Sequence, residues 1–372
     1  MTPTKLFSTV TLGGTNSPIQ LQHRVAMAPL TRCRADGDGV QPAYAATYYG
    51  QRASAGGLIV AEATNISATA RGYYGSPGIY TQQQIDAWKA VTSAVHDKQG
   101  KIFLQLWHTG RVGHPSNQPN GQLPVSSSAR PFTDPIKQAV TSVGRQPFGT
   151  PRALETNEIP DIVADYRKAT VNALAAGFDG VEIHAANGYL IEQFLCNGVN
   201  DRTDAYGGSI ENRARLLFEV VEAILESVDS SRVGIRLSPF NVLFSCTDSS
   251  PLETYSYVIN KLNDYNLAYV HLIEPRGFHP TGALAPPEGV LKIFRKIYRG
   301  VLLTASGYTR ETAIKVVADG DADIVVFGRY FITNPDLVKR LQLDAPLTPF
   351  EGKNFYGGGE TGYTDYPFLE DN

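Results

Sequence analysis

The amino-acid sequence predicts an α/β protein folded as a (β/α)₈ barrel. The first observation is that eight short apolar segments of strand-like composition alternate with helical segments along the chain. The second is that several of these segments end in polar or small residues, as the strands of a barrel do where they open onto a binding site. The third is size, since 372 residues with 42% hydrophobic side chains can bury one large core. We therefore predict a single domain over residues 1–372.

A small hairpin over residues 6–21, with Gly13 and Gly14 at its turn, is expected to close one end of the barrel. The eight strands are predicted at residues 24–31, 58–63, 102–106, 179–184, 233–237, 269–273, 301–305 and 323–327. The helices are predicted at residues 43–55, 83–98, 156–177, from 189 to 195, 209–228, 252–262, 287–298 and 310–318, with a closing helix through 341. Thr156 is the expected N-cap of the helix that ends at Gly177.

A long segment after the third strand, from Val112 to about Glu155, is rich in Gly, Pro, Ser, Asn and Gln and has no periodic pattern. A segment of this kind inside a compact domain is usually a lid or a binding loop, and a passive surface insertion is the alternative. We expect a long loop here.

A doubly wound parallel sheet is the competing architecture. It lacks support because no glycine fingerprint follows the first strand. The segment Gly357–Gly362 matches G-x-G-x-x-G, but it lies too near the C-terminus for a helix and a second strand to follow it.

Composition excludes several classes of function. The net charge is −3 and the basic residues are dispersed, which argues against binding to nucleic acid or to an anionic membrane. No apolar run is long enough to span a bilayer. Cys33, Cys196 and Cys246 are far apart, so neither an iron–sulfur cluster nor a zinc site is indicated and a reducing compartment is expected. We predict no bound metal, a cytoplasmic location, and a monomer or homodimer.

The chain is organised around the stretch Asp179–Leu190, where a strand ends in His184 and a turn carries Asn187 and Tyr189. His184 and Asn187 can donate hydrogen bonds, and Tyr189 is a weak acid with an ordinary pKa of about 10. Two donors and a weak acid suit a reaction that builds negative charge on an oxygen and then protonates a neighbouring carbon. The structural alternative is a capping Asn, a core His and a packed Tyr.

The other strand ends supply mostly neutral hydrogen-bonding groups together with two arginines. There is no carboxylate pair for glycoside chemistry, no Ser-His-Asp set and no group of metal ligands among them. Small residues after the seventh and eighth strands mark the usual phosphate site of a barrel. A circle of such residues around the barrel mouth suits a phosphate-bearing planar heterocycle such as FMN. Its members are Thr31, Ala63, Gln105, His184, Arg236, Ser306, Gly307, Gly328 and Arg329.

The chain resembles the Old Yellow Enzyme family of FMN-dependent NAD(P)H oxidoreductases, which includes the 12-oxophytodienoate and pentaerythritol tetranitrate reductases. The resemblance spans residues 6–367 and rests on these segments: Met27–Arg32, Gln105–Arg111, Gly180–His184, Ala186–Leu190, Asn200–Asp204, Tyr206–Ser209, Arg236–Pro239 and Phe327–Arg329. It implies an ene-reductase that uses NADPH and non-covalent FMN to reduce the activated C=C bond of unsaturated carbonyl or nitro compounds, by ping-pong hydride transfer through the flavin.

The resemblance also implies roles for individual residues. His184 and Asn187 would hold the substrate's activating oxygen or the nicotinamide amide, and Tyr189 would donate the proton. Thr31 would tune the flavin, and Ser306, Gly307, Gly328 and Arg329 would hold its phosphate. Other flavin contacts are expected from Pro29, Leu30, Ala63, Gln105 and Arg236, and other substrate contacts from Tyr73, Trp107 and Tyr356.

The chain departs from the family at Ser306, where many relatives carry Gly. Residues 243–250 and 277–285 correspond to substrate-facing loops and fit no tight pattern, so substrate choice stays open. A dihydroorotate-type dehydrogenase is one alternative, against which the set His184, Asn187 and Tyr189 argues. A flavin-binding protein without turnover is another, in which Tyr189 would have no role.

Overall fold

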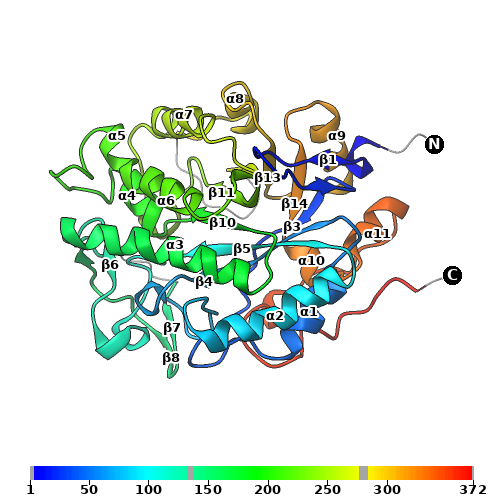
Figure 1. Cartoon of the computed structure of the whole chain (residues 1–372), viewed down its shortest axis with the longest axis horizontal. Coiled ribbons are helices and arrows are strands. Elements are labelled where there is room, and N and C mark those ends of the chain that lie inside the picture. The colour runs from blue at the N-terminus through cyan, green and yellow to red at the C-terminus, as the bar shows by residue number, and fades with distance from the viewer. Residues whose placement is uncertain (1–3, 133–136, 276–283, 371–372) are drawn as a thin grey trace.

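The computed structural model is a closed barrel of eight parallel strands surrounded by helices (Figure 1). The structure describes residues 4–132, 137–275 and 284–370. The barrel order is β10-β11-β12-β13-β14-β3-β4-β5, so the predicted fold class is confirmed. The strands are β3 (Val25–Met27), β4 (Leu58–Asn65), β5 (Lys101–Trp107), β10 (Gly180–Ala185), β11 (Val233–Leu237), β12 (Tyr269–Ile273), β13 (Leu302–Ala305) and β14 (Ile324–Phe327).

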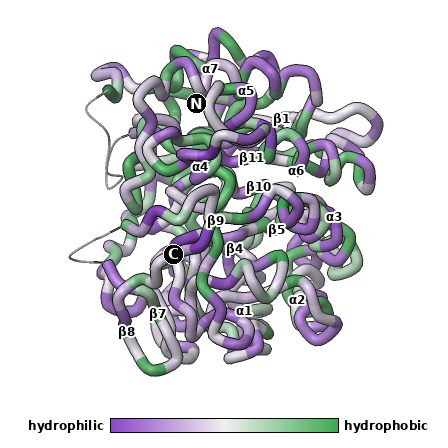
Figure 2. Tube along the Cα trace, turned by 90° about the vertical axis from the view of Figure 1, so that its left-hand side faces the viewer, coloured by the Kyte–Doolittle hydropathy of each residue, from purple (hydrophilic) through white to green (hydrophobic). Residues whose placement is uncertain are grey.

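The helices cover the outside of the barrel, and in Figure 2 the turns of α2 and α3 change between hydrophilic and hydrophobic colours. Helix α2 begins with a capping box between Thr81 and Gln84, and it buries Ile85, Trp88 and Val91 against the strands. The helices are α1 (Tyr44–Arg52), α2 (Gln82–His96), α3 (Ile159–Ala175), α4 (Leu190–Leu195), α5 (Ile210–Arg213), α6 (Arg215–Leu225), α7 (Pro251–Leu262), α8 (Leu291–Arg295), α9 (Arg310–Ala318), α10 (Arg329–Thr333) and α11 (Leu337–Leu343). No helix in the described ranges is long and apolar enough to cross a membrane.

Four helix predictions differ from the structure. The helix expected at 209–228 is divided at Ala214 into α5 and α6, and the helix at 287–298 is reduced to α8. The closing helix is divided into α10 and α11 near Pro335, which lacks the N–H that a continuous helix needs. Thr156 is not an N-cap: Glu155 caps a short 3₁₀ turn at Thr156–Glu158, and the Thr156 hydroxyl donates to Asp204 at 2.6 Å instead.

The N-terminal hairpin is present as β1 (Val10–Thr11) paired with β2 (Gln20–Leu21). The Gly13 N–H donates to the Ala268 carbonyl, just before β12 begins, so the hairpin closes the N-terminal end of the barrel. A Cβ at Gly13 would lie 2.1 Å from the Leu267 carbonyl oxygen, which explains the glycine.

The long loop after β5 contains two small sheets. β6 (Val125–Ser126) pairs with β9 (Arg152–Ala153), and β7 (Ala139–Thr141) pairs with β8 (Gly144–Gln146) as a hairpin at the lower left of Figure 1. Phe132 and Phe148 of this loop pack in one cluster with Tyr73, Tyr189 and Phe244. Because that cluster contains the predicted proton donor, a binding loop is favoured over a passive insertion.

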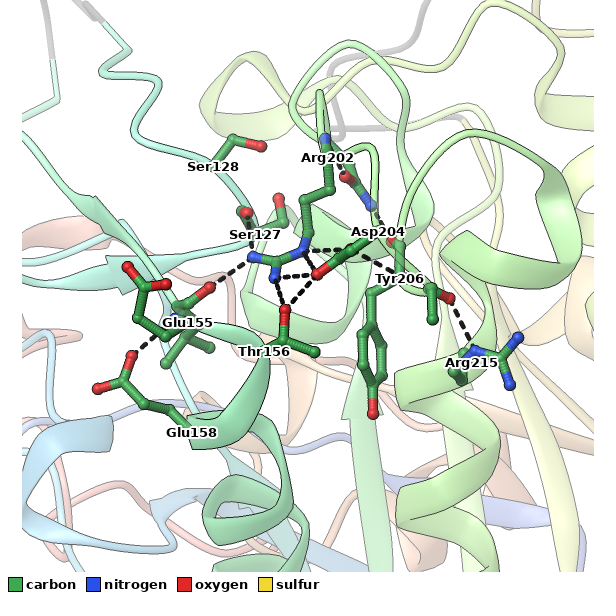
Figure 3. Close-up of polar contacts among 12 residues, drawn as sticks. Ser127, Ser128, Glu155, Thr156, Glu158, Arg202, Asp204, Tyr206 and Arg215 are labelled. Atoms are coloured by element: carbon green, nitrogen blue, oxygen red, sulfur yellow. Dashed lines mark hydrogen bonds and ion pairs between the residues drawn. The ribbon is translucent and has the colours of Figure 1, made fainter.

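Arg202, which lies between α4 and α5, links this loop to the segment that follows α4 (Figure 3). Its guanidinium donates to the carbonyl oxygen of Ser127 at 3.0 Å and also to that of Leu154, and it forms an ion pair with Asp204. The ion pair and hydrogen bonds hold the pKa of Asp204 below its usual value. The motif around Asp201–Asp204 therefore has a structural role in this chain.

The C-terminal segment is fastened by two arginines that follow β3. Arg32 donates to the carbonyl oxygens of Phe355 at 2.8 Å and Gly362 at 2.7 Å, and Arg34 donates to those of Gly359 at 2.9 Å and Thr361 at 3.0 Å. The glycine-rich stretch Gly357–Gly362 thus presents its carbonyls to guanidinium groups. The fastening places Tyr356 beside the residues that follow β3.

Candidate active site

A cavity of about 370 Å³ lies at the C-terminal ends of the barrel strands. Eight of the ten predicted flavin contacts line it: Pro29, Leu30, Thr31, Arg236, Ser306, Gly307, Gly328 and Arg329. Asn187 and Tyr356 line the same cavity. A larger cavity of about 750 Å³ lies outside the barrel among α1, α2 and α11, and its lining contains no predicted site residue.

The remaining predicted substrate contacts form an aromatic cluster. The Trp107 ring stacks on Tyr73 with centroids 5.4 Å apart and meets the edge of Tyr189 at 4.9 Å. Tyr189 in turn lies edge-on to His184 at 5.0 Å. The structure therefore brings Tyr73, Trp107, His184 and Tyr189 together, from β5, β10 and the loops that follow β4 and β10.

His184 is held in the neutral form. Burial, followed by the nearby positive charge of Arg236, holds its pKa well below the usual value. Its Nδ1 is buried and has no hydrogen-bond partner among the described residues. A neutral imidazole supplies one donor and one acceptor, so His184 can donate to a substrate oxygen without carrying charge.

Tyr189 is held in the protonated form. Burial raises its pKa above the ordinary value, and burial likewise raises that of Tyr73, whose hydroxyl oxygen lies 3.2 Å from that of Tyr189. A phenol that keeps its proton at neutral pH can serve as a proton donor.

The turn at Asn187 is strained and is held by hydrogen bonds. Asn187 has φ of 58°, in the left-handed region that non-glycine residues rarely adopt. Its N–H donates to Ser238 Oγ at 2.7 Å, and the next N–H, of Gly188, donates to the Glu192 carboxylate. Ser238 itself donates to Glu192 at 2.6 Å, so one buried carboxylate supports both peptide groups of the turn.

This arrangement gives Glu192 a measurable pH signature. Burial raises its pKa from 4.5 to about 7. Its contribution to stability is therefore full below pH 4.5 and is lost as pH rises through about 7. We expect wild type to lose on the order of 2 kcal/mol of unfolding free energy relative to Glu192→Gln between about pH 5 and pH 7.5. Urea unfolding of both proteins at each pH measures this, and an equal pH dependence in the two would contradict the expectation.

A buried polar network lies deeper in the barrel. The Glu182 carboxylate accepts from Gln105 Nε2 at 2.7 Å and pairs with His271 Nδ1 at 2.9 Å. Burial opposes ionisation of Glu182, but His271, Arg236 and Gln105 outweigh it and lower the pKa of the carboxyl. Glu182 is therefore an anion that offsets the charge of Arg236 beneath the cavity.

Ser306 and Gly307 form the corner where β13 ends. Both have positive φ, 104° for Ser306 and 68° for Gly307. Glycine adopts such an angle freely, whereas serine is strained by about 1–3 kcal/mol. The predicted phosphate corner thus keeps a glycine-type backbone in spite of its serine, and strain of this kind collects at functional sites.

The residues of this cavity fit FMN. The Arg236 Nε is buried without a partner among the described residues, which is the condition expected of a donor aimed at a flavin. Arg329 adds a second guanidinium beside the Ser306–Gly307 corner, where a phosphate would be bound. In the described part of the chain, no group of three or more His, Cys, Asp or Glu side chains is arranged to hold a metal ion.

The cavity lining does not include every predicted contact, since it lacks the four members of the aromatic cluster, Tyr73, Trp107, His184 and Tyr189. Ala63 and Gln105 are buried in β4 and β5 and are absent from the cavity lining, although Gln105 contacts the network that offsets Arg236. Tyr356 stands at the rim with 64% of its surface exposed. Of the predicted substrate-facing loop at 277–285, residues 277–283 lie outside the described residues.

Sequence reasoning missed the groups that support the site, which are Glu182, Glu192, Ser238, Asn241 and His271. Ser238 and Glu182 stand in segments that carry the family resemblance, so a signal was present for these two. Asn241 and His271 stand among apolar neighbours, where only the folded barrel shows what they contact.

The chain is similar to known proteins over most of its length. A family model described as the NADH:flavin oxidoreductase / NADH oxidase family matches residues 5–348. The chain is 51% identical over 355 residues to 12-oxophytodienoate reductase 1 of Oryza sativa subsp. japonica, covering 95% of this chain and 91% of that protein. It is similar to the structure of morphinone reductase, with a TM-score of 0.92 and 49% identity over 99% of this chain and 97% of that one. It is also similar to the Old Yellow Enzyme homologue of Zymomonas mobilis, with a TM-score of 0.91 and 40% identity over 98% of this chain and 99% of that one.

The fold, the cavity and these comparisons define a barrel oxidoreductase that uses FMN and acts on activated alkenes. The chain belongs to the NADH:flavin oxidoreductase / NADH oxidase family. The predicted resemblance to Old Yellow Enzyme is confirmed, as are FMN and a nicotinamide hydride donor, since one morphinone reductase structure is a complex with tetrahydroNAD.

Proposed function

We propose that the chain is an NADPH-dependent ene-reductase that reduces the C=C bond of α,β-unsaturated carbonyl and nitro compounds by a ping-pong mechanism. The observation that supports this most directly is the meeting of a protonated Tyr189, a neutral His184 and a cavity-lining Asn187 at the strand ends that carry the flavin contacts. Residues 1–372 would form one FMN-binding domain.

FMN would be held by Pro29, Leu30 and Thr31 together with two arginines that line the same cavity. Arg236 would lie at the ring, and Arg329, with Ser306, Gly307 and Gly328, at the phosphate. Ala63 and Gln105 are proposed to support the ring from the barrel interior. When bound, FMN accepts a hydride from the nicotinamide and passes it to the substrate β-carbon.

The substrate is proposed to bind with its carbonyl or nitro oxygen at His184 and Asn187, and the same pair would hold the nicotinamide amide in the other half-reaction. Both are neutral donors in a buried site, where one donor to a developing oxyanion contributes about 3–4 kcal/mol. Tyr189 then donates its proton to the α-carbon. Tyr73, Trp107 and Tyr356 line the path of the substrate.

The test is the absorption spectrum of the purified protein, which we expect to be yellow with one non-covalent FMN per chain. Colourless protein that gains no flavin band on addition of FMN would exclude this function. The same preparation should oxidise NADPH steadily when an enone is added, because a binding protein without turnover would stop after one equivalent. The cytoplasmic location and the monomeric or homodimeric state stay predictions.

A further inference from the structure

Asn187 carries one donor group and one acceptor group at the end of its side chain, and only one of them can face the substrate. The carbonyl oxygen of the amide accepts hydrogen bonds and the NH₂ donates them. Which end enters the cavity therefore decides whether the site binds an acceptor, such as a ketone oxygen, or a donor. The structure contains a group that makes this choice.

That group is Asn241, which lies in the loop after β11 and is 7% exposed. Its Oδ1 accepts from the backbone N–H of Leu243 at 2.8 Å, and its Nδ2 donates to Asn187 Oδ1 at 3.1 Å. A backbone N–H can only donate, so the end of Asn241 that faces it must be the oxygen. The NH₂ of Asn241 must then face Asn187, and Asn187 must present its own oxygen to Asn241.

The orientation of Asn187 follows from these contacts. With Oδ1 turned toward Asn241, the NH₂ of Asn187 is left for the cavity that this residue lines. The backbone of Asn187 cannot shift to change this, because its N–H is held by Ser238 Oγ at 2.7 Å. The Asn241 N–H also donates to the Ser238 carbonyl oxygen at 3.1 Å, so the residue that orients Asn187 is itself fixed to the same anchor.

We propose that Asn241 is a positioning residue that holds the NH₂ of Asn187 toward the substrate and so makes the site selective for ligands that accept a hydrogen bond there. This inference rests on the proposed function, since it places the substrate's activating oxygen at Asn187. It adds a specificity determinant that never touches the substrate.

Asn241→Asp is a nearly isosteric substitution that should reverse the orientation of the Asn187 amide. An ionised carboxylate only accepts, so it can still receive the Leu243 N–H but can no longer donate to Asn187 Oδ1. The Asn187 amide then turns to donate to the introduced carboxylate, and its carbonyl oxygen faces the cavity. Asn241→Ala removes the hydrogen bond that orients the Asn187 amide without favouring the opposite orientation, although it deletes more side-chain atoms.

The test measures binding of cyclohexanone, whose oxygen only accepts, and of cyclohexanol, whose hydroxyl can also donate. Dissociation constants are taken from the shift of the flavin absorbance at about pH 8, where a carboxylate is ionised at its ordinary pKa, and neither ligand is charged or reducible at a C=C bond. We expect Asn241→Asp to weaken cyclohexanone binding about tenfold and Asn241→Ala about threefold. Cyclohexanol should bind Asn241→Asp within about twofold of wild type, because its hydroxyl can donate to the reversed amide.

Asn187→Ala supplies the matched background. If Asn241 acts only through Asn187, neither substitution at 241 should change cyclohexanone binding further once Asn187 is alanine. The inference would be overturned if Asn241→Ala lost more cyclohexanone affinity than Asn241→Asp. It would also be overturned if the substitutions at 241 lost as much affinity in the Asn187→Ala background as in wild type, because either result would show structural damage. FMN content and melting temperature identify any variant that fails to fold. If one of the two variants at position 241 fails, the other is compared with wild type and with the Asn187→Ala background in the same way.

Failure of the two proposals can be told apart. Wild type that neither holds FMN nor reduces 2-cyclohexenone contradicts the proposed function. Wild type that does both, together with Asn241→Asp that binds cyclohexanone as tightly as wild type, contradicts the role of Asn241 alone.

Discussion

Tyr189→Phe is expected to leave reduction of the flavin by NADPH near normal and to slow the enone-dependent reoxidation by a factor on the order of 10²–10⁴. The substitution removes the hydroxyl and almost no volume, so the ring contacts with His184 and Trp107 should survive. Only the second half-reaction needs a proton at the α-carbon. Stopped-flow absorbance of each half-reaction measures the two rates separately.

The matched control for this result is Tyr73→Phe. It removes the hydroxyl that lies 3.2 Å from that of Tyr189 and leaves the proposed proton donor in place. We expect a much smaller effect on reoxidation from this change. A nitro-activated alkene should also suffer less in Tyr189→Phe, because the nitronate product is stable enough to leave before it is protonated. Equal slowing of both half-reactions would mean that Tyr189 only shapes the pocket.

Arg236→Ala is expected to weaken FMN binding about 10- to 100-fold and to lower the flavin reduction potential. The first effect follows because a hydrogen bond from a charged donor contributes roughly 1.5–3 kcal/mol. The second follows because the flavin loses a neighbouring positive charge that favours the addition of electrons. Titration of apoprotein with FMN, followed by flavin fluorescence, measures the first effect, and a redox titration measures the second.

The substitution also leaves Glu182 without its offsetting cation. An uncompensated buried charge costs about 3–5 kcal/mol, so the variant should be less stable as well. Arg236→Lys separates the contributions, since it keeps the positive charge and loses the planar fork. Full flavin occupancy and an unchanged potential in Arg236→Ala would show that Arg236 does not hold the flavin.

The barrel strands were predictable because each is a short, mostly apolar segment bounded by turn residues, and burial of both faces favours such segments in a parallel sheet. The cofactor residues that line the cavity could be predicted from the sequence for a related reason. Strand ends of one barrel meet at one face, so Arg236 and Arg329 fall together although they are far apart in the sequence. Their convergence needs only the strand order.

What the sequence did not predict depends on contacts between loops. Thr156 has the residue type of an N-cap, but an ion-paired carboxylate at Asp204 offers its hydroxyl a charged acceptor. Asn241 and Glu192 act on the turn at Asn187 from a separate loop and from the following helix, through hydrogen bonds that no periodicity encodes. Ser306 occupies a glycine-type conformation that only the backbone angle reveals.

Closure of the barrel joins the first of its strands to the last, with Val25 in register with Val325 and Met27 with Phe327. A chain that leaves the ribosome N-terminus first therefore carries β3 with one unpaired edge until almost all of the protein has been made. The C-terminal segment, whose carbonyl oxygens accept hydrogen bonds from Arg32 and Arg34, is synthesised later still. The residues after β3 and the corner after β13 come together only at that stage. We therefore expect FMN to bind only after synthesis of the chain is complete, because a ribosome-bound intermediate lacks part of the binding site.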